Sequence, residues 1–275
     1  MTKNLSQLHG AARRIRTRIL TVAHHAPGDG VHVSPALSIV DILSALYGSV
    51  MHYDARTITD MHRDVFILSK GHAALGLYAT LSEFGIITSE QLETFELNGS
   101  VLQVHPTKYA EYGIDFSGGS LAQGLSFATG LALGRHLKNE VWHTYVLVGD
   151  GECNEGAIWE CAFMAAHYKV DNLTLIVDRN GLQSDGHTDD IMQMDLEALW
   201  RACHWETIVC DGHNLRALLD AFAAPSNGKP KVIIANTVKG KGVSFMENNK
   251  EFHRNRISAQ QLNDALSELD GSSSC

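Results

Sequence analysis

Two hydrophobic patterns alternate along most of the chain. Short, nearly continuous apolar runs predict strands that are buried on both faces, whereas longer segments with apolar residues at helical spacing predict the connecting helices. The expected strands are 64–68, a run ending at Gly149, a run ending at Asn180, 206–209 and 231–235. The expected helices are 5–24, 34–47, 73–84, a short one after 88, one from the glycine-rich turn 117–124 through 136, one after Gly151, 195–203, 214–223 and one after 258.

This alternation of strands and helices predicts an α/β fold, with a mostly parallel sheet and helices on both of its faces. Three helix starts carry local signals. Ser34-Pro35 combines a capping residue with proline at the first helical position. Thr88 and Ser258 each precede a glutamine by three residues, which is the spacing of a capping box.

The domain organisation is expected to be simple. A length of 275 residues suits one large α/β domain, and we expect a single domain over residues 1–275. No internal repeat, low-complexity segment or linker divides it. The part from about residue 258 is predicted to be a helix followed by a frayed tail at 271–275.

Composition and charge narrow the functional classes. A net charge of −9 argues against a nucleic-acid partner, and the four arginines within 13–18 are better explained as a solvated helix face. Charged residues or histidine interrupt each apolar run, so we expect no membrane span, and the amino terminus lacks the apolar core of a signal peptide. The five cysteines form no Cys-x-x-Cys pair, which disfavours zinc and disulfides and makes a cytoplasmic location the expectation.

The segment Gly149-Asp150-Gly151 carries the clearest chemical signal. Its third glycine, Gly156, comes too late for the dinucleotide fingerprint, and Asp150 would repel a pyrophosphate unless a cation lay between them. Asn180 ends the next strand along, so a right-handed crossover places both side chains at one edge of the sheet. Oxygen ligands of this kind suit Mg²⁺, and Gly151 allows the backbone to approach a phosphate.

A simpler interpretation is a strand–helix turn in which the glycines provide geometry and Asp150 caps the helix. For Gly-Asp-Gly alone that interpretation would be preferred. The presence of Asn180 at a second strand end favours a metal–diphosphate site.

These residues and their surroundings resemble the transketolase family. Gly-Asp-Gly followed thirty residues later by Asn matches the thiamine diphosphate fingerprint. The family's sequence around this fingerprint closely resembles 149–160 and 171–183 of this chain. Segments 68–74, 118–124 and 237–248 are similar as well. The similarity runs from about residue 10 to 268, with the motifs in the family's order and spacing.

The resemblance implies a thiamine diphosphate-binding fold, and thiamine diphosphate with Mg²⁺, or else Ca²⁺ or Mn²⁺, as cofactors. The implied metal ligands are the side chains of Asp150 and Asn180 and the carbonyl of Leu182. The implied cofactor contacts are Gly119, Leu121, Gly151, Glu155, Asn180, Lys239, His72 and His253. Glu155 and Asp178 match acidic positions at contacts between two cofactor-binding domains.

Four histidines are the implied catalytic residues: His32, His72, His105 and His253. A histidine is usually structural in a chain that has fifteen of them. The matching family positions contact cofactor or sugar, and an imidazole with a pKa near neutrality suits proton transfer to and from sugar hydroxyls. Counting back from residues 41–43 places His32 at the family's histidine position. His25 is a weaker candidate for the same position.

Two segments depart from the family pattern. The family usually has Ser-Gly-His-Pro-Gly where this chain reads Asp29-Gly-Val-His-Val-Ser34, and Trp-His-Gly-Lys where it reads Phe252-His-Arg-Asn255. Both segments match parts of the family that meet the substrate. The identity of the sugar is therefore open, as is the role of Arg254.

The family's full-length members also contain a pyrimidine-binding domain and a carboxy-terminal domain, and this chain matches neither. We therefore expect the amino-terminal subunit of a split transketolase. It would need a second chain carrying the pyrimidine-binding domain, and would form a two-plus-two heterotetramer. The implied reaction moves a two-carbon ketol unit from a ketose phosphate to an aldose phosphate, as in the pentose phosphate pathway.

Two alternatives stay open. The chain could belong to another thiamine diphosphate enzyme, either one like deoxyxylulose-phosphate synthase or a specialised sugar-catabolic transketolase. It could also be a non-catalytic regulatory fragment, although the intact Asp150 and Asn180 disfavour that.

Overall fold

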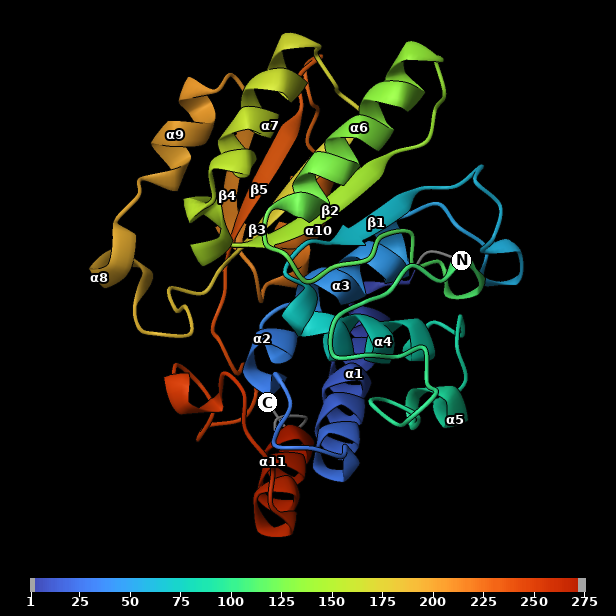
Figure 1. Ribbon diagram of the computed structural model, residues 1–275, viewed down its shortest axis with the longest axis vertical. Helices are drawn as coiled ribbons and strands as arrows, with labels where there is room; N and C mark the ends of the chain where they lie inside the picture. Colours follow the sequence, from blue (N-terminus) through green and yellow to red (C-terminus); the bar gives the residue numbers. More distant parts are fainter. Residues whose placement is uncertain (1–2, 272–275) are drawn as a thin grey trace.

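The computed structural model describes residues 3–271, and a sheet of five parallel strands forms its centre (Figure 1). The strands are β1 (Val65–Leu68), β2 (Thr144–Gly149), β3 (Leu173–Arg179), β4 (Glu206–Asp211) and β5 (Lys231–Asn236). Their order across the sheet is β1-β2-β3-β5-β4, so β5 lies between β3 and β4. The five predicted strands and the parallel α/β sheet are confirmed.

The alternation of side chains along the strands divides the apolar interior into two cores. In β1, Val65 and Ile67 pack into the core on one face of the sheet, and Phe66 and Leu68 pack into the core on the other. Successive residues of a strand point to opposite faces, so a strand covered on both sides is apolar at nearly every position.

Three helices cover one face of the sheet: α6 (Gln123–Leu137), α7 (Gly156–His167) and α9 (Leu196–Ala202). Each helix is followed by a residue with left-handed backbone, namely Asn139, Lys169 and His204. After α7, the Lys169 N–H donates to the Ala166 carbonyl at 3.1 Å and the Val170 N–H donates to the Ala165 carbonyl at 3.0 Å. This is a Schellman motif, which satisfies the last carbonyl groups of the helix.

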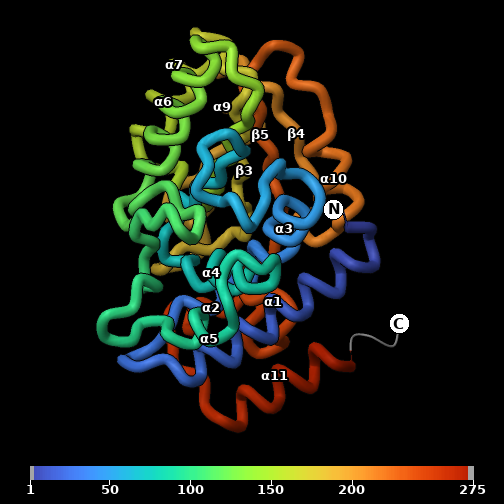
Figure 2. Tube along the Cα trace, turned by 90° about the vertical axis from the view of Figure 1, so that its right-hand side faces the viewer, coloured from blue at the N-terminus to red at the C-terminus, as the bar shows by residue number. Residues whose placement is uncertain are grey.

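The opposite core is built mainly from helices of the amino-terminal part of the chain. They are α1 (Leu5–His25), α2 (Val33–Leu37), α3 (Val40–Ala45) and α4 (Ala74–Glu83), and they are joined by α10 (Leu215–Ala223) from the later part of the chain. Outside them lie α5 (Ser89–Leu92) and α11 (Ala259–Gly271), and Figure 2 shows α11 alongside α1. The capping boxes predicted at Thr88 and Ser258 are present. Of the tail predicted at 271–275, Gly271 is the last residue of α11, and 272–275 lie outside the described residues.

One predicted helix differs from the structure. The expected helix 34–47 starts at Val33, with His32 rather than Ser34 in the N-cap position, two residues earlier than predicted. It then breaks between α2 and α3, and continues after α3 as a π-helical turn at Leu46–Val50. The stretch Val33–Val50 is long and apolar enough to span a bilayer, contrary to our expectation for any segment, but 89% of it is buried inside the protein. Its apolar character is thus explained by the core.

Short elements complete the chain. The sequence pattern did not predict α8 (Thr188–Met192), which has only five residues, none of them buried, and is too short to show helical periodicity. Single helical turns of the 3₁₀ type occur at Ala55–Thr57, Gly71–Ala73, Ala110–Tyr112, Gly151–Asn154 and Lys250–Phe252. Two of these turns, Gly71–Ala73 and Gly151–Asn154, follow β1 and β2 directly and shape the site described next.

Candidate active site

The segments that follow four strands surround a cavity of about 280 Å³ at the carboxyl edge of the sheet. The carboxyl ends of parallel strands meet at one edge, and ligands of open α/β sheets bind there. The cavity is lined by His32, Pro35, Lys70, His72, Gly119, Leu121, Gly149, Asp150, Gly151, Glu152, Asn180, Leu182, Gln183, Ser184, Lys239 and His253.

Asp178 of β3 joins several of these segments beneath the cavity. Its side chain is 0% exposed, and Oδ2 accepts hydrogen bonds from Lys70 Nζ at 2.5 Å and from Ser38 Oγ at 2.8 Å. Asn180 Nδ2 and Thr237 Oγ1 also donate to this carboxylate. Burial raises the pKa of Asp178, but the charge and hydrogen bond of Lys70 outweigh burial, and the pKa lies below its usual range. Asp178 therefore holds together segments of this chain, and its expected place at a contact between domains stays a prediction.

Asp150 and Asn180 lie side by side, as the strand-end argument predicts. Asp150 Oδ2 accepts from the Gly181 N–H at 2.7 Å, and Oδ1 accepts from the Gly151 N–H at 2.9 Å. Burial, followed by the negative charge of Asp178, raises the pKa of Asp150 to about 6. A buried carboxylate whose charge is this poorly compensated fits a site for a cation.

Other potential cation ligands lie close by. Asn180 Oδ1 accepts from the Leu182 N–H at 3.1 Å, and the Leu182 carbonyl accepts from Lys239 Nζ at 3.0 Å. Burial lowers the pKa of Lys239 to about 8, with the nearby Lys70 ammonium as the next cause. Within residues 3–271 no three His, Cys, Asp or Glu side chains form a metal-ligating group. The predicted ligand set lies outside that definition, because it consists of one carboxylate, one side-chain amide and one backbone carbonyl.

Two glycines bring backbone close to the cavity. A Cβ atom on Gly151 would lie 2.7 Å from Gln183 Cγ, so no larger residue fits there without displacing that side chain. Gly119 has a φ of +139°, which L side chains rarely adopt. Leu121 follows in the same loop and is 37% exposed, although it is a large apolar residue. This loop therefore places an exposed apolar side chain in the lining of the cavity.

Glu152 fixes that loop from below. Its Oε1 accepts from Ser69 Oγ at 2.5 Å and from the Ala122 N–H at 2.7 Å, while Oε2 accepts from the Gly149 N–H at 3.0 Å. The carboxylate is buried and thus connects the segments after β1 and before α6 to the end of β2. Ala122 has a φ of +68°, a conformation that costs free energy in a non-glycine residue.

The four predicted histidines form one cluster, and three of them, His32, His72 and His253, line the cavity. The ring centroid of His32 lies 5.5 Å from His72, 5.2 Å from His253 and 6.4 Å from His105. His72 and His253 are 5.4 Å apart. His25, the rival of His32, instead bonds within its own helix, where Nδ1 lies 2.8 Å from the Thr21 carbonyl.

These imidazoles are held in the neutral form. Burial, followed by the charge of Arg254, lowers the pKa of His32 to about 4, and burial with the charge of Lys239 lowers that of His253 to about 3. Burial also lowers the pKa of His72 and His105. The buried Nδ1 atoms of His32 and His253 have no hydrogen-bond partner within residues 3–271, and neither has Gln183 Nε2. Unpaired buried polar atoms beside a cavity fit a polar ligand.

The structure brings most of the predicted site residues together. Each lies in the cavity lining except His105, which belongs to the histidine cluster, and Glu155, which is exposed at the start of α7 and lies away from the lining. Sequence reasoning did not identify Lys70, Glu152, Gln183 or Ser184. Lys70 follows a buried strand closely, so the strand-end argument used for Asp150 could have found it.

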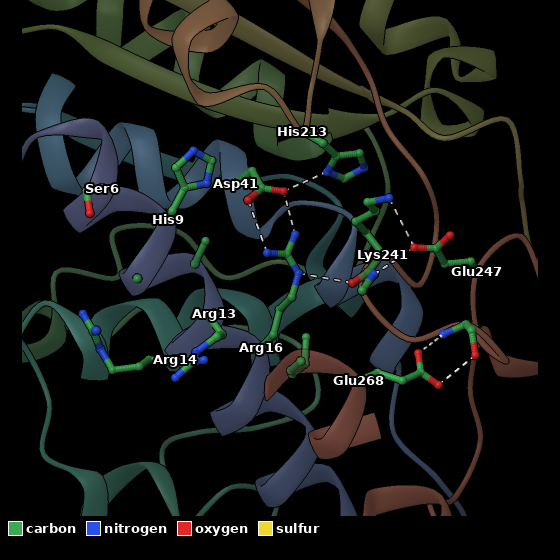
Figure 3. Close-up of a pocket in the computed structure, with 15 residues that line it drawn as sticks. Ser6, His9, Arg13, Arg14, Arg16, Asp41, His213, Lys241, Glu247 and Glu268 are labelled. Atoms are coloured by element: carbon green, nitrogen blue, oxygen red, sulfur yellow. Dashed lines mark hydrogen bonds and ion pairs between the residues drawn. The ribbon is translucent and has the colours of Figure 1, made fainter. Parts of the chain in front are cut away.

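A larger cavity, of about 1100 Å³, lies away from this site, between α1, α11 and the segment after β5 (Figure 3). Arg16 Nη2 donates to Asp41 Oδ2 at 2.6 Å, and His213 Nδ1 lies 2.8 Å from the same oxygen. Arg16 Nε also donates to the Lys241 carbonyl, and the Val238 N–H donates to His213 Nε2. This buried network anchors both ends of the segment that carries Lys239 into the active-site cavity.

Comparisons with known proteins agree with this geometry. Residues 11–270 match the family model described as "Transketolase, thiamine diphosphate binding domain". The chain is 40% identical to an apulose-4-phosphate transketolase subunit of Actinobacillus succinogenes, over 97% of this chain and 98% of that protein. It is 39% identical to the 6-deoxy-6-sulfo-D-fructose transketolase subunit SqwG of a Clostridium species, over 87% and 88% of the two chains.

Longer proteins are similar as well. The chain is 34% identical to human transketolase, over 97% of this chain but 42% of that protein. The fold matches that of transketolase from Leishmania mexicana with a TM-score of 0.86, at 23% identity, over 98% of this chain and 42% of that one. For transketolase from Campylobacter jejuni the TM-score is 0.85 at 25% identity, over 98% and 43%.

Proposed function

The chain belongs to the transketolase family, and we propose that it is the amino-terminal subunit of a two-chain transketolase that acts on a specialised sugar. The similarity to proteins named as transketolase subunits, at 39–40% identity, supports two chains over one, because the longer human enzyme is 34% identical. The named sugars of those relatives favour the specialised alternative over the pentose phosphate pathway. No observation on this chain favours a regulatory fragment.

The observation that carries the proposal is that one cavity is lined by two different polar groups of residues. One group is Asp150, Asn180 and Leu182 beside the tight turn at Gly151. The other is a set of neutral imidazoles, of which His32 and His253 have an unpaired ring nitrogen. A ligand with a diphosphate at one end and a reactive ring near the other fits this arrangement, and thiamine diphosphate has that form.

We propose that Asp150, Asn180 and the Leu182 carbonyl hold a divalent cation, with Mg²⁺ as the expected ion. Carboxylate, amide and carbonyl oxygens are the ligands this ion prefers, and it retains places for phosphate oxygens. The raised pKa of Asp150 supports a missing positive charge at this point. The ammonium groups of Lys70 and Lys239 add positive charge on the same side of the cavity.

Thiamine diphosphate, when bound, supplies the carbon nucleophile and electron sink for cleaving and forming carbon–carbon bonds. The residues of this chain position the reactants and transfer protons. A neutral imidazole has one N–H donor and one acceptor nitrogen, so His32 and His253 can hold two sugar hydroxyls by hydrogen bonds. The 117–122 loop, held by Glu152, provides the surface for a ring.

We further propose that a second chain provides the pyrimidine-binding domain and completes the active site, in a two-plus-two assembly. The names of the relatives as subunits support a partner, and the stoichiometry follows from the family resemblance alone. Mixing the purified chain and partner with Mg²⁺ and thiamine diphosphate should produce ketol transfer that neither chain shows alone. Full turnover by this chain alone would overturn the two-chain proposal.

The cation site can be tested by Asp150→Ala. The substitution should reduce Mg²⁺-dependent binding of thiamine diphosphate in the reconstituted complex by more than about 100-fold, since even residues behind a metal ligand are worth 10- to 100-fold. Calorimetric titration measures this affinity, and far-ultraviolet circular dichroism checks the fold. Asp189→Ala, at an exposed position of α8, is the matched control. Unchanged cofactor affinity in Asp150→Ala would refute the metal assignment.

A further inference from the structure

The two segments that depart from the family pattern lie against each other in the structure. Val31 and Asn255 form an isolated antiparallel bridge, with N···O distances of 3.0 and 3.1 Å in the two directions. A Cβ atom on Gly30 would lie 2.7 Å from the carbonyl carbon of Asn255, so the approach requires glycine. Changes at 29–34 and 252–255 are therefore parts of one structural unit, which we call the paired rim (residues 28–32 and 253–256).

Two arginines fasten the paired rim. Arg254 Nε donates to the Gly30 carbonyl at 3.2 Å, and Arg256 Nε donates to the Gly28 carbonyl at 2.7 Å. They differ in their remaining nitrogens. Arg256 Nη2 also donates to Gly28 and lies 4.0 Å from Asp29, whereas the two Nη atoms of Arg254 form no hydrogen bond or ion pair within residues 3–271.

Arg254 borders a cavity of about 450 Å³ that adjoins the cofactor cavity. Ser184 and His253 line both, and Arg256 lines neither. Arg254 also lies near enough to His32 for its charge to act on that imidazole. Arg254 therefore lies next to the histidine cluster and beside a second cavity, which has room for the part of a sugar farthest from the reacting carbons.

We propose that Arg254 binds the anionic end of the sugar substrate, a tetrahedral phosphate or sulfonate group. This inference rests on the proposed function and names a specificity-determining residue for it. The terminal nitrogens of a guanidinium form a fork that matches two oxygens of such a group. The relatives are named for sugars that carry a phosphate or a sulfo group, and both groups have this chemistry.

The charges around the adjoining cavity are mixed, so an anion would be held there by directed hydrogen bonds from the guanidinium and not by a net positive charge. Lys250 adds a second positive charge, but Asp185 and Glu251 contribute two negative charges, and Glu96 is close enough to feel Arg254. Net charge alone would therefore not recruit an anion. The unpaired fork of Arg254 supplies directed hydrogen-bond donors, which a diffuse positive charge would not supply.

The test compares three donors that differ only at carbon 6: fructose 6-phosphate, 6-deoxy-6-sulfofructose and fructose. Apulose 4-phosphate and apulose form a second pair. Steady-state kinetics are measured on the complex of this chain with its partner subunit, using wild type, Arg254→Met and Arg254→Lys. Arg256→Met is the matched control, because Arg256 fastens the same rim but lines neither cavity.

We expect Arg254→Met to raise the KM for the charged donor about tenfold, in line with a partly exposed charge-assisted hydrogen bond. The KM for the neutral sugar should change less than about twofold, kcat should change little, and Arg254→Lys should restore part of the loss. Arg256→Met should affect charged and neutral donors equally. The preference of wild type for phosphate or sulfonate identifies which anion is native.

An equal rise in KM for charged and neutral donors with Arg254→Met would show that Arg254 only supports the rim, and would overturn the inference while ketol transfer stands. Absence of transfer with every donor would overturn the proposed function instead. A measurement without turnover then decides the anion site. Inorganic phosphate, titrated into this chain, should shift the His32 and His253 ring signals in nuclear magnetic resonance for wild type but not for Arg254→Met, and equal shifts in both would refute it.

Discussion

Glu152 shows how a single buried side chain sets the shape of the active site. One carboxylate accepts three hydrogen bonds, from Ser69, Ala122 and Gly149, and each donor belongs to a different segment of the cavity. Burial raises the pKa of Glu152, and these three donors act against that rise. Because all its partners donate, the ionised form is the one that fits.

We expect Glu152→Ala to lower the free energy of unfolding by about 3 kcal/mol, because three buried donors lose their acceptor. Thiamine diphosphate should bind about tenfold more weakly, since the loop that carries Ala122 is no longer held. Urea denaturation and calorimetric titration measure the two effects.

Glu160→Ala, on the exposed side of α7, is the control and should change neither. Glu152→Gln keeps one acceptor oxygen and should lie between wild type and Glu152→Ala. Cofactor affinity equal to that of wild type in Glu152→Ala would show that other contacts hold the loop.

At the residue scale, sequence reasoning found the groups that follow from strand ends and family motifs. Asp150 and Asn180 are predictable because each ends a strand in a parallel sheet. The roles of Glu152 and Asp178 are not, because their partners, such as Ala122 and Thr237, are distant in the chain. A buried carboxylate that joins several segments can be recognised only when its hydrogen-bond donors are known.

At the scale of single elements, the carboxyl ends of three helices share one backbone feature. The residues after α6, α7 and α9 all adopt left-handed backbone, yet none is glycine. In α9 the Schellman motif is completed by an apolar contact, because the Trp205 ring lies 4.9 Å from that of Trp200 in the last turn.

Lys169 after α7 has a φ of +52° and an exposed side chain. We expect Lys169→Gly to raise the free energy of unfolding by roughly 0.5–1 kcal/mol, because glycine adopts this conformation without strain. Lys169→Ala removes the same side chain but keeps Cβ and should bring no gain. Thermal and urea unfolding of the three proteins would check this, and an equal gain in both variants would attribute the effect to the lysine side chain instead.

The break between α2 and α3 shows why helix boundaries were harder to predict than strands. Apolar periodicity continues through 34–47 and predicts one helix. The structure interrupts it at Ser38, whose Oγ donates to Asp178 at 2.8 Å and lies 3.1 Å from the Pro35 carbonyl oxygen. The helix is thus interrupted where it contacts β3, which is far away in sequence. The local pattern of apolar residues cannot predict such a contact.

Across the whole molecule, several imidazoles are buried without charge. The pKa is lowered to about 4 in His32 and His143 and to about 3 in His253, in each case first by burial. In the unfolded chain these groups take up protons below about pH 6.5, whereas the folded protein excludes them until about pH 4. Their contribution to stability is therefore complete above pH 6.5 and is lost as the pH falls. Asp150 acts in the opposite sense, because the folded state binds its proton near pH 6.

We expect the free energy of unfolding to fall between pH 7.5 and 5.5, with each such histidine contributing about 1 kcal/mol at pH 5.5. His143→Gln should remove one of these contributions and flatten the pH dependence by that amount. The imidazole of His143 lies away from the cofactor cavity, beside Thr174, so the site is preserved. His9→Gln, at an exposed position, is the control. A pH dependence in His143→Gln identical to that of wild type would contradict the assignment.

The arrangement of the whole sheet was only partly predictable. Alternation of strands and helices predicted a parallel sheet, but not that β5 would lie between β3 and β4. That strand order depends on contacts between segments that are far apart in sequence, which a local pattern does not reveal. It places Thr237 and Lys239, which follow β5, next to the residues that follow β3, and so it determines the cavity as much as any motif does.

The paired rim has a consequence for how this protein could evolve. The cofactor end of the cavity is held by Asp178 and Glu152, which are buried and bonded to the ends of the sheet. The rim is held mainly by bonds between its own two segments, at Gly30, Val31 and Asn255. A lineage can thus acquire a new sugar by altering two short stretches together while its catalytic chemistry stays unchanged. For protein engineering, these stretches form a cassette that should be exchanged as a pair.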